Sequence, residues 1–242
     1  MDKKKSLKIN LSLNAIKGML SVVFPLITFP YVSRVLGVER LGRYNYANSI
    51  ISYFALLAGL GINTYAIREG ARIRGDRKKI DKFVAEVFSI NIVSTIISYL
   101  VLFSLLITNN RLHGYEQLIL LLSLQIVFTT IGVEWIYSIF EDYLFITLRS
   151  IVFQLVSVAL LFLLVHDKND LFWYVVVCLF SIVGTSLLNL IYSKKYCSVR
   201  LTLSLNIRKH IKPILILFGM SITIVIYVSS DTTILGVLCG DY

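Results

Sequence analysis

Long apolar stretches recur along this chain, separated by short polar connections. Each has about 20 residues or more, the length an α-helix needs to cross a hydrocarbon core of about 30 Å. Backbone amides in lipid must be paired within the segment, so we expect these stretches to be helices. The pattern predicts an all-α fold, a polytopic transmembrane helical bundle of about seven spans. The expected spans are 11–36, 44–66, 84–108, 117–140, 144–165, 172–193 and 213–238.

Five of the expected helices carry polar side chains on one face. Ser, Thr and Gly at such positions often only pack helices together. Asn, Lys, Glu and Asp are costlier in lipid and should face protein or water, which favours the hydrated interior of a transporter. The stripes are Asn10, Asn14, Lys17, Ser21 and Thr28; Asn45, Asn48, Ser52, Gly59 and Asn63; Ser123, Thr130, Glu134, Ser138 and Glu141; Ser181, Thr185, Asn189 and Tyr192; and Gly219, Thr223, Tyr227 and Ser230.

The first expected span also contains two of the three prolines, Pro25 and Pro30. Each removes a backbone donor, so we expect this helix to bend there. Transporters use broken helices as hinges or to expose backbone to a cavity, although prolines are also ordinary residues in membrane helices.

Composition and charge placement agree with a membrane protein. A chain that is 57% hydrophobic over 242 residues cannot bury that surface in one soluble core. Its net charge of +10 is not spread evenly, because Lys and Arg concentrate in the N-terminal tail and in the segments 67–83 and 194–212. Basic segments stay on the cytoplasmic side during insertion, so we expect these three to be cytoplasmic. The charge therefore reports topology rather than nucleic-acid binding, and contact with anionic lipid is its by-product.

Among the charged residues within or near the ends of the expected spans, three cations and two acids are candidates for function. Lys17 is a candidate anion site, with snorkelling to the interface as the alternative. Arg34 and Arg68 close helix ends, where each either binds substrate or anchors the helix. Glu134 and Asp231 are candidates for coupling to H⁺ or Na⁺, with an interhelical ion pair or hydrogen bond as the alternative.

The sequence gives little support to an enzyme. His113, His166 and His210 lie in connections without metal-ligand spacing or a neighbouring nucleophile. The three cysteines are too few and too scattered for a disulfide framework or a metal site. No phosphate-cradling loop occurs, so we expect neither catalysis nor a resident cofactor.

Several motifs, taken together, resemble those of bacterial polysaccharide flippases, the O-antigen and capsule repeat-unit transporters of the multidrug/oligosaccharidyl-lipid/polysaccharide exporter superfamily. The resemblance is spread over the whole chain and is specific only in combination. The motifs are FPYVSRVLG at 29–37, GRYNYA at 42–47, GLGINTYAIRE at 59–69, EWIY at 134–137, EDY at 141–143, ITLRS at 146–150 and DTTILG at 231–236.

This resemblance implies a substrate class and a location. The substrate would be an undecaprenyl-pyrophosphate-linked oligosaccharide, turned across the bacterial cytoplasmic membrane for surface polysaccharide synthesis. Lys17, Arg34 and Arg68 would supply cations for the pyrophosphate. Asn14 and Asn63 would supply amide partners for the sugars.

Family members have two related six-helix bundles, whereas this chain offers one bundle and a further helix. We therefore expect residues 1–212 to form the N-terminal six-helix bundle and 213–242 the first helix of a truncated second bundle. Val35–Val38 is faintly echoed by Ile234–Val237, as a duplicated plan would require. A second half-transporter or another copy of the chain is then the expected protein partner, and the chain alone is not expected to transport.

Two other functions stay open at this stage. One is a multidrug or small-solute cation antiporter of the same superfamily, which would favour an acidic, aromatic cavity. The other is a non-transporting membrane assembly subunit.

Overall fold

The computed structural model describes residues 7–109, 112–204 and 206–239, and this part of the chain is helical without strands. Six of its helical segments are long and apolar enough to cross a membrane. The predicted all-α polytopic bundle is therefore confirmed. The helices are α1 (Leu7–Gly59), α2 (Ile62–Ile73), α3 (Arg77–Thr108), α4 (Glu116–Ile131), α5 (Trp135–Ile139), α6 (Tyr143–Leu164), α7 (Leu171–Ser193) and α8 (Ile207–Cys239).

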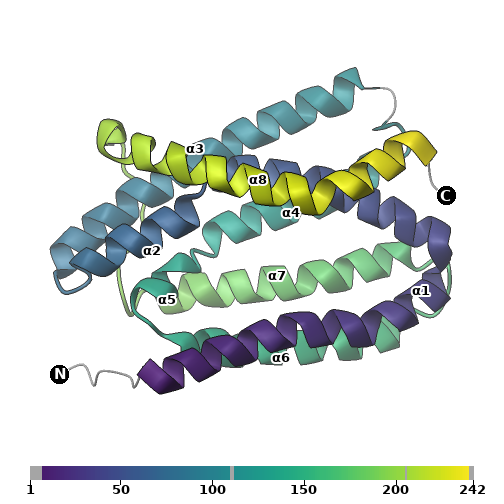
Figure 1. Ribbon diagram of the computed structural model, residues 1–242, viewed down its shortest axis with the longest axis horizontal. Coiled ribbons are helices and arrows are strands. Elements are labelled where there is room, and N and C mark those ends of the chain that lie inside the picture. Colours follow the sequence, from purple (N-terminus) through teal and green to yellow (C-terminus); the bar gives the residue numbers. More distant parts are fainter. Residues whose placement is uncertain (1–6, 110–111, 205, 240–242) are drawn as a thin grey trace.

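Helix α1 contains the first expected span and most of the second. It consists of two helices joined at Gly37, whose φ of 77° and ψ of 170° are not helical. Figure 1 shows the chain running along the bundle, turning at its far end and returning. Pro25 and Pro30, where the sequence predicts a bend, lie inside α1 with helical backbone angles, and the interruption comes at Gly37 instead. Glycine has no Cβ and adopts positive φ without strain, so it makes the sharper break.

A second interruption separates α1 from α2. Leu60 and Gly61 both have positive φ, at 45° and 70°. A Cβ at Gly61 would lie 2.8 Å from the backbone nitrogen of Phe218, so only glycine lets α8 pack this closely on the turn. Helix α2 then buries one face, which includes Tyr65, and exposes Arg68 on the other.

The expected span at 117–140 is also divided. Helix α4 ends at Ile131, and the short α5 begins at Trp135. Between them Val133 has a φ of 38°, which a β-branched residue adopts only under constraint. Val133 is fully buried in the apolar cluster that joins α2, α3 and α5, and this packing holds the turn.

The basic segments share one end of the bundle. In Figure 1 the start of α1, helix α2, the start of α3 and the start of α8 all lie toward the left, and the α3–α4 and α6–α7 connections lie toward the right. The charge pattern predicts this grouping of 67–83 with 194–212 and the N-terminus. Which end is cytoplasmic stays a prediction.

Helix α8 is the least buried of the long helices. Only 6% of its most apolar window is buried inside the molecule, compared with 39% for α3 and 50% for the segment that includes α4. Met220 and Tyr227 are 64% and 82% exposed. Its surface is therefore covered by lipid or by another protein.

Candidate functional site

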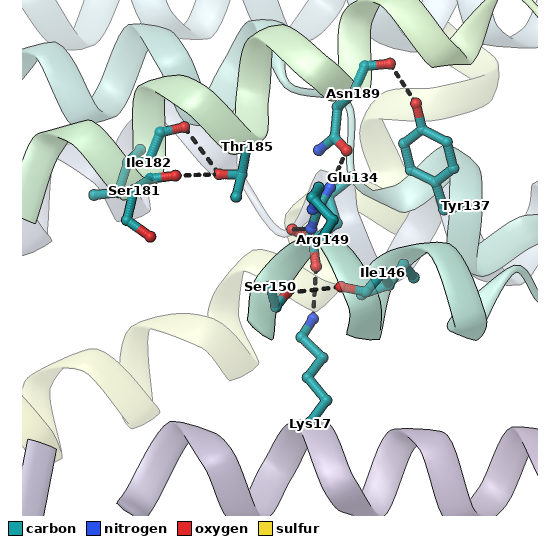
Figure 2. Close-up of polar contacts among 10 residues, drawn as sticks. All are labelled: Lys17, Glu134, Tyr137, Ile146, Arg149, Ser150, Ser181, Ile182, Thr185 and Asn189. Carbon is teal, nitrogen blue, oxygen red and sulfur yellow. Dashed lines mark hydrogen bonds and ion pairs between the residues drawn. The ribbon is translucent and has the colours of Figure 1, made fainter. Parts of the chain in front are cut away.

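The main polar cluster joins three helical segments that are distant in sequence. Nζ of Lys17, on α1, lies 2.7 Å from Oε1 of Glu134, at the start of α5. Nη2 of Arg149, on α6, lies 3.1 Å from the other oxygen of the same carboxylate. Figure 2 shows Lys17 reaching across from α1 toward this pair. We call Lys17, Glu134 and Arg149 the ion triad; its three charges sum to +1.

Arg149 is the buried member of the ion triad. Its side chain is 3% exposed, against 37% for Lys17 and 47% for Glu134. Its Nη1 donates to Oδ1 of Asn189 on α7, and the backbone oxygen of Asn189 accepts a hydrogen bond from the Tyr137 hydroxyl (Figure 2). A buried guanidinium needs such partners, because an unpaired charge in a dry interior is very costly. Arg149 and Asn189 thus fix the site, whereas Lys17 and Glu134 face accessible space.

The break between α4 and α5 places Glu134. A Cβ at Gly132 would lie 2.8 Å from the Ser186 hydroxyl oxygen, so glycine permits α4 to approach α7 closely here. The turn at Val133 then directs the chain toward α6. Because Glu134 precedes α5 rather than lying in a continuous helix, its carboxylate can meet cations from α1 and α6 together.

Two adjoining cavities extend from the ion triad between α1, α6 and α7. The smaller, of about 170 Å³, is lined by Glu134 and Arg149. The larger, of about 280 Å³, is lined by Pro25 and Tyr174 among others. They share Gln154 and Ser181. The polar stripes predicted on the first and sixth spans therefore do face a cavity, through Ser21 and Thr28 on one side and Ser181 and Thr185 on the other.

The cavity walls contain buried polar atoms without a hydrogen-bond partner. Within the described residues these are Nε of Arg149, Oε1 of Gln154 and Oγ of Ser157. Orphaned polar atoms beside a space of this size are the usual setting for water or for a polar ligand. The lining can thus accept and donate hydrogen bonds along the path away from the triad.

The structure brings together only two of the site residues predicted from sequence, Lys17 and Glu134. Asn14 and Asn63 are exposed and are not part of the ion triad. Arg34 is exposed beyond the larger cavity, near the Gly37 turn. Arg68 is 66% exposed on α2 and lies 3.5 Å from Glu69. Asp231 is exposed on α8.

Sequence reasoning did not select Arg149 or Asn189 as site residues. Arg149 lies in the ITLRS motif at 146–150, and Asn189 lies in the polar stripe of the sixth span. An arginine one turn inside an apolar stretch was the signal that could have identified the first. Its partner, on a helix forty residues away, could not be identified from spacing.

The described residues contain no group of three His, Cys, Asp or Glu side chains placed to hold a metal ion. The ion triad can bind a charged ligand by exchanging one of its own ion-pair partners for it. An anion can compete with Glu134 for Lys17, and a cation can compete with Lys17 for Glu134.

Comparisons with known proteins agree with a transport role. The chain is 27% identical over 169 residues to an Escherichia coli (strain K12) protein named "Putative O-antigen transporter". This match covers 69% of the chain and 40% of that protein. No solved structure matches the chain. The polysaccharide biosynthesis protein family matches residues 7–242, and the chain belongs to this family.

Proposed function

We propose that this chain forms part of a flippase that turns undecaprenyl-pyrophosphate-linked oligosaccharide repeat units across the bacterial cytoplasmic membrane. The single observation that carries the proposal is the ion triad, a net positive site at the edge of a polar cavity between membrane helices. The name of the Escherichia coli relative supports a role in O-antigen transport. The lipid tail can stay in the bilayer while the charged headgroup passes through the cavity.

In the proposed mechanism the pyrophosphate competes with a carboxylate. Lys17 has its ammonium group 2.7 Å from Glu134 and is 37% exposed, so it can exchange this partner for a phosphate oxygen. Arg149 stays in place because Asn189 holds it. Arg34 and Arg68 lie away from the triad, so any contact they make with substrate belongs to entry or exit.

Coupling to an ion gradient follows from the same contact. A proton or Na⁺ bound at Glu134 neutralises the carboxylate and releases Lys17 for the substrate. Because linkage is reciprocal, substrate bound at Lys17 frees Glu134 for the ion by the same factor. Asp231 is the second proposed coupling acid, through α8.

A protein partner completes the proposed transporter. The match spans 40% of the relative's length, and α8 exposes most of its surface. We propose that a second half-transporter, or another copy of this chain, packs against α8 and closes the cavity. The N-terminal bundle would be residues 1–212, with 213–242 as the first helix of the other bundle.

The test is complementation of an Escherichia coli strain that lacks its O-antigen transporter. The chain is expressed alone, and together with the part of the Escherichia coli relative that the match does not cover. We expect surface O-antigen only from the pair. Full O-antigen from the chain alone would overturn the proposal of a second half-transporter and would leave another copy of this chain as the partner. Resistance to ethidium without surface O-antigen would favour a cation antiporter. Neither O-antigen nor resistance, although both chains are present in the membrane, would favour an assembly subunit.

A further inference from the structure

A separate pocket of about 500 Å³ lies at the end of the bundle that carries the basic segments. One wall comes from the first turns of α3, and the other from the segment that links α7 to α8 (Figure 1). Three exposed cations line it: Lys78, Lys82 and Arg200. We call it the basic pocket, and it shares no residue with the ion triad or its cavities.

The acids of the basic pocket already have partners. Asp81 accepts a hydrogen bond of 2.8 Å from the Ser198 amide and pairs with Arg77. Glu86 is buried, with Oε2 at 2.8 Å from Nε2 of His210.

The three lining cations, in contrast, make no ion pair within the described residues. Lys79, their neighbour outside the pocket, is paired with Asp76 at 3.2 Å. The pocket therefore presents unneutralised positive charge to whatever enters it.

The wall that contains Arg200 is fixed to α3 and carries two exposed leucines, of which Leu201 also lines the pocket. The Thr202 amide donates to the Ser89 hydroxyl at 2.9 Å, which ties this wall to α3. Polar Arg200, Thr202 and Ser204 alternate with Leu201 and Leu203, which are 64% and 102% exposed. Both leucines lie outside the candidate membrane spans, so the spans do not account for their exposure.

We propose that the basic pocket binds the phosphate headgroup of an anionic phospholipid, while Leu201 and Leu203 insert among its acyl chains. Charge complementarity selects the headgroup, because three free cations meet one phosphate. Exposed leucines beside the cations select a lipid over a soluble anion, since burying them in acyl chains removes apolar surface from water. A bound lipid here would hold the α7–α8 link at the membrane surface. The inference does not depend on transport.

The test measures lipid retained by the purified, delipidated chain, using native mass spectrometry from detergent micelles that contain phosphatidylglycerol or phosphatidylcholine. We expect one phosphatidylglycerol to be retained in preference to phosphatidylcholine. Lys78→Ala, Lys82→Ala and Arg200→Ala together should weaken its binding by about 100-fold, since each surface cation contributes about 1 kcal/mol. The matched control removes Lys194, Arg208 and Lys209, which are exposed cations of the same end that do not line the pocket.

Two further arms separate the sources of phosphate. Leu201→Ser with Leu203→Ser should weaken phosphatidylglycerol binding while leaving all three cations in place. Inorganic pyrophosphate should not displace the lipid at equal concentration. Three results would each overturn the proposal. The first is equal retention of both lipids, and the second is an equal loss of phosphatidylglycerol binding in the pocket and control triple variants. The third is displacement of the lipid by pyrophosphate together with no effect of the leucine changes.

Discussion

Nζ of Lys17 lies 2.7 Å from Oε1 of Glu134, although 117 positions separate the two residues. The contact connects the first membrane helix to the α4–α5 break. Each side chain is more than a third exposed, so the pair contributes little to stability. A weak, accessible ion pair beside a polar cavity can be exchanged at low cost, which is what a binding and coupling site requires.

Glu134→Gln should tighten the binding of farnesyl pyrophosphate, a short polyprenyl pyrophosphate. The amide no longer competes as a charge for Lys17, so the remaining charges of the triad sum to +2. The affinity of wild type should change with pH or Na⁺ by more than the titration of the ligand itself explains. The variant should lose this additional dependence. Isothermal titration at several pH values and Na⁺ concentrations measures both effects. An unchanged affinity and an unchanged dependence would limit Glu134 to a packing role.

Arg149→Met should destabilise the chain by roughly 1–3 kcal/mol, because it leaves the buried amide oxygen of Asn189 without its hydrogen-bond partner. The side chain of Arg149 is 3% exposed, and Asn189 and Glu134 both lose a partner. Arg68→Met is the matched control, since that side chain is 66% exposed and should change stability by less than about 0.5 kcal/mol. Thermal unfolding in detergent compares the two. Similar midpoints would contradict the account of Arg149 as the fixed member of the triad.

A second buried network anchors α8. The Tyr65 hydroxyl lies 2.6 Å from Nδ1 of His210, whose Nε2 lies 2.8 Å from Glu86. Tyr65→Phe removes one hydrogen bond and should cost about 1 kcal/mol. His210→Leu leaves the Glu86 carboxylate buried without its partner and should cost about 3–5 kcal/mol. Limited proteolysis of the α7–α8 link and thermal unfolding report the loss; equal effects of the two variants would be inconsistent with this network.

Topology can be tested by cysteine labelling in intact cells. In a background without native cysteines, Lys79→Cys and Lys168→Cys should react from opposite sides, with Lys79→Cys protected from outside reagents. Reaction of Lys79→Cys from outside would reverse the proposed orientation.

In the wild-type chain, Cys197 should stay unlabelled while the chain is folded, because burial, together with the Asp81 carboxylate, raises the pKa of its thiol to about 12. At neutral pH its reactive thiolate is therefore scarce.

The sequence predicted the helices well because lipid imposes the same requirement on every span. Apolar length and amide pairing suffice to locate α3, α6 and α7. The interruptions were harder, since Gly37 and Val133 break helices through packing and backbone geometry that spacing does not encode. The prolines, which looked like the stronger breakers, are accommodated within α1.

The site was partly predictable for a related reason. Polar stripes on the first and sixth spans indicated a hydrated interior, and Ser21 and Thr185 do line cavities. A stripe shows that a face avoids lipid, but it does not show which helix faces it. The three-dimensional arrangement was needed to pair Lys17 with Glu134. It was also needed to place Arg149 between Glu134 and Asn189.

The most direct test of the central claim is the affinity of farnesyl pyrophosphate for the purified chain and for Lys17→Ala, measured by isothermal titration with farnesol as the uncharged comparison. The account predicts that wild type binds the pyrophosphate and not farnesol, and that Lys17→Ala loses most of this binding while Lys17→Arg retains more. Lys168→Ala and the triple alanine variant of the basic pocket should bind like wild type. Equal affinity in wild type and Lys17→Ala would contradict the claim and leave Lys17 only as the ion-pair partner of Glu134.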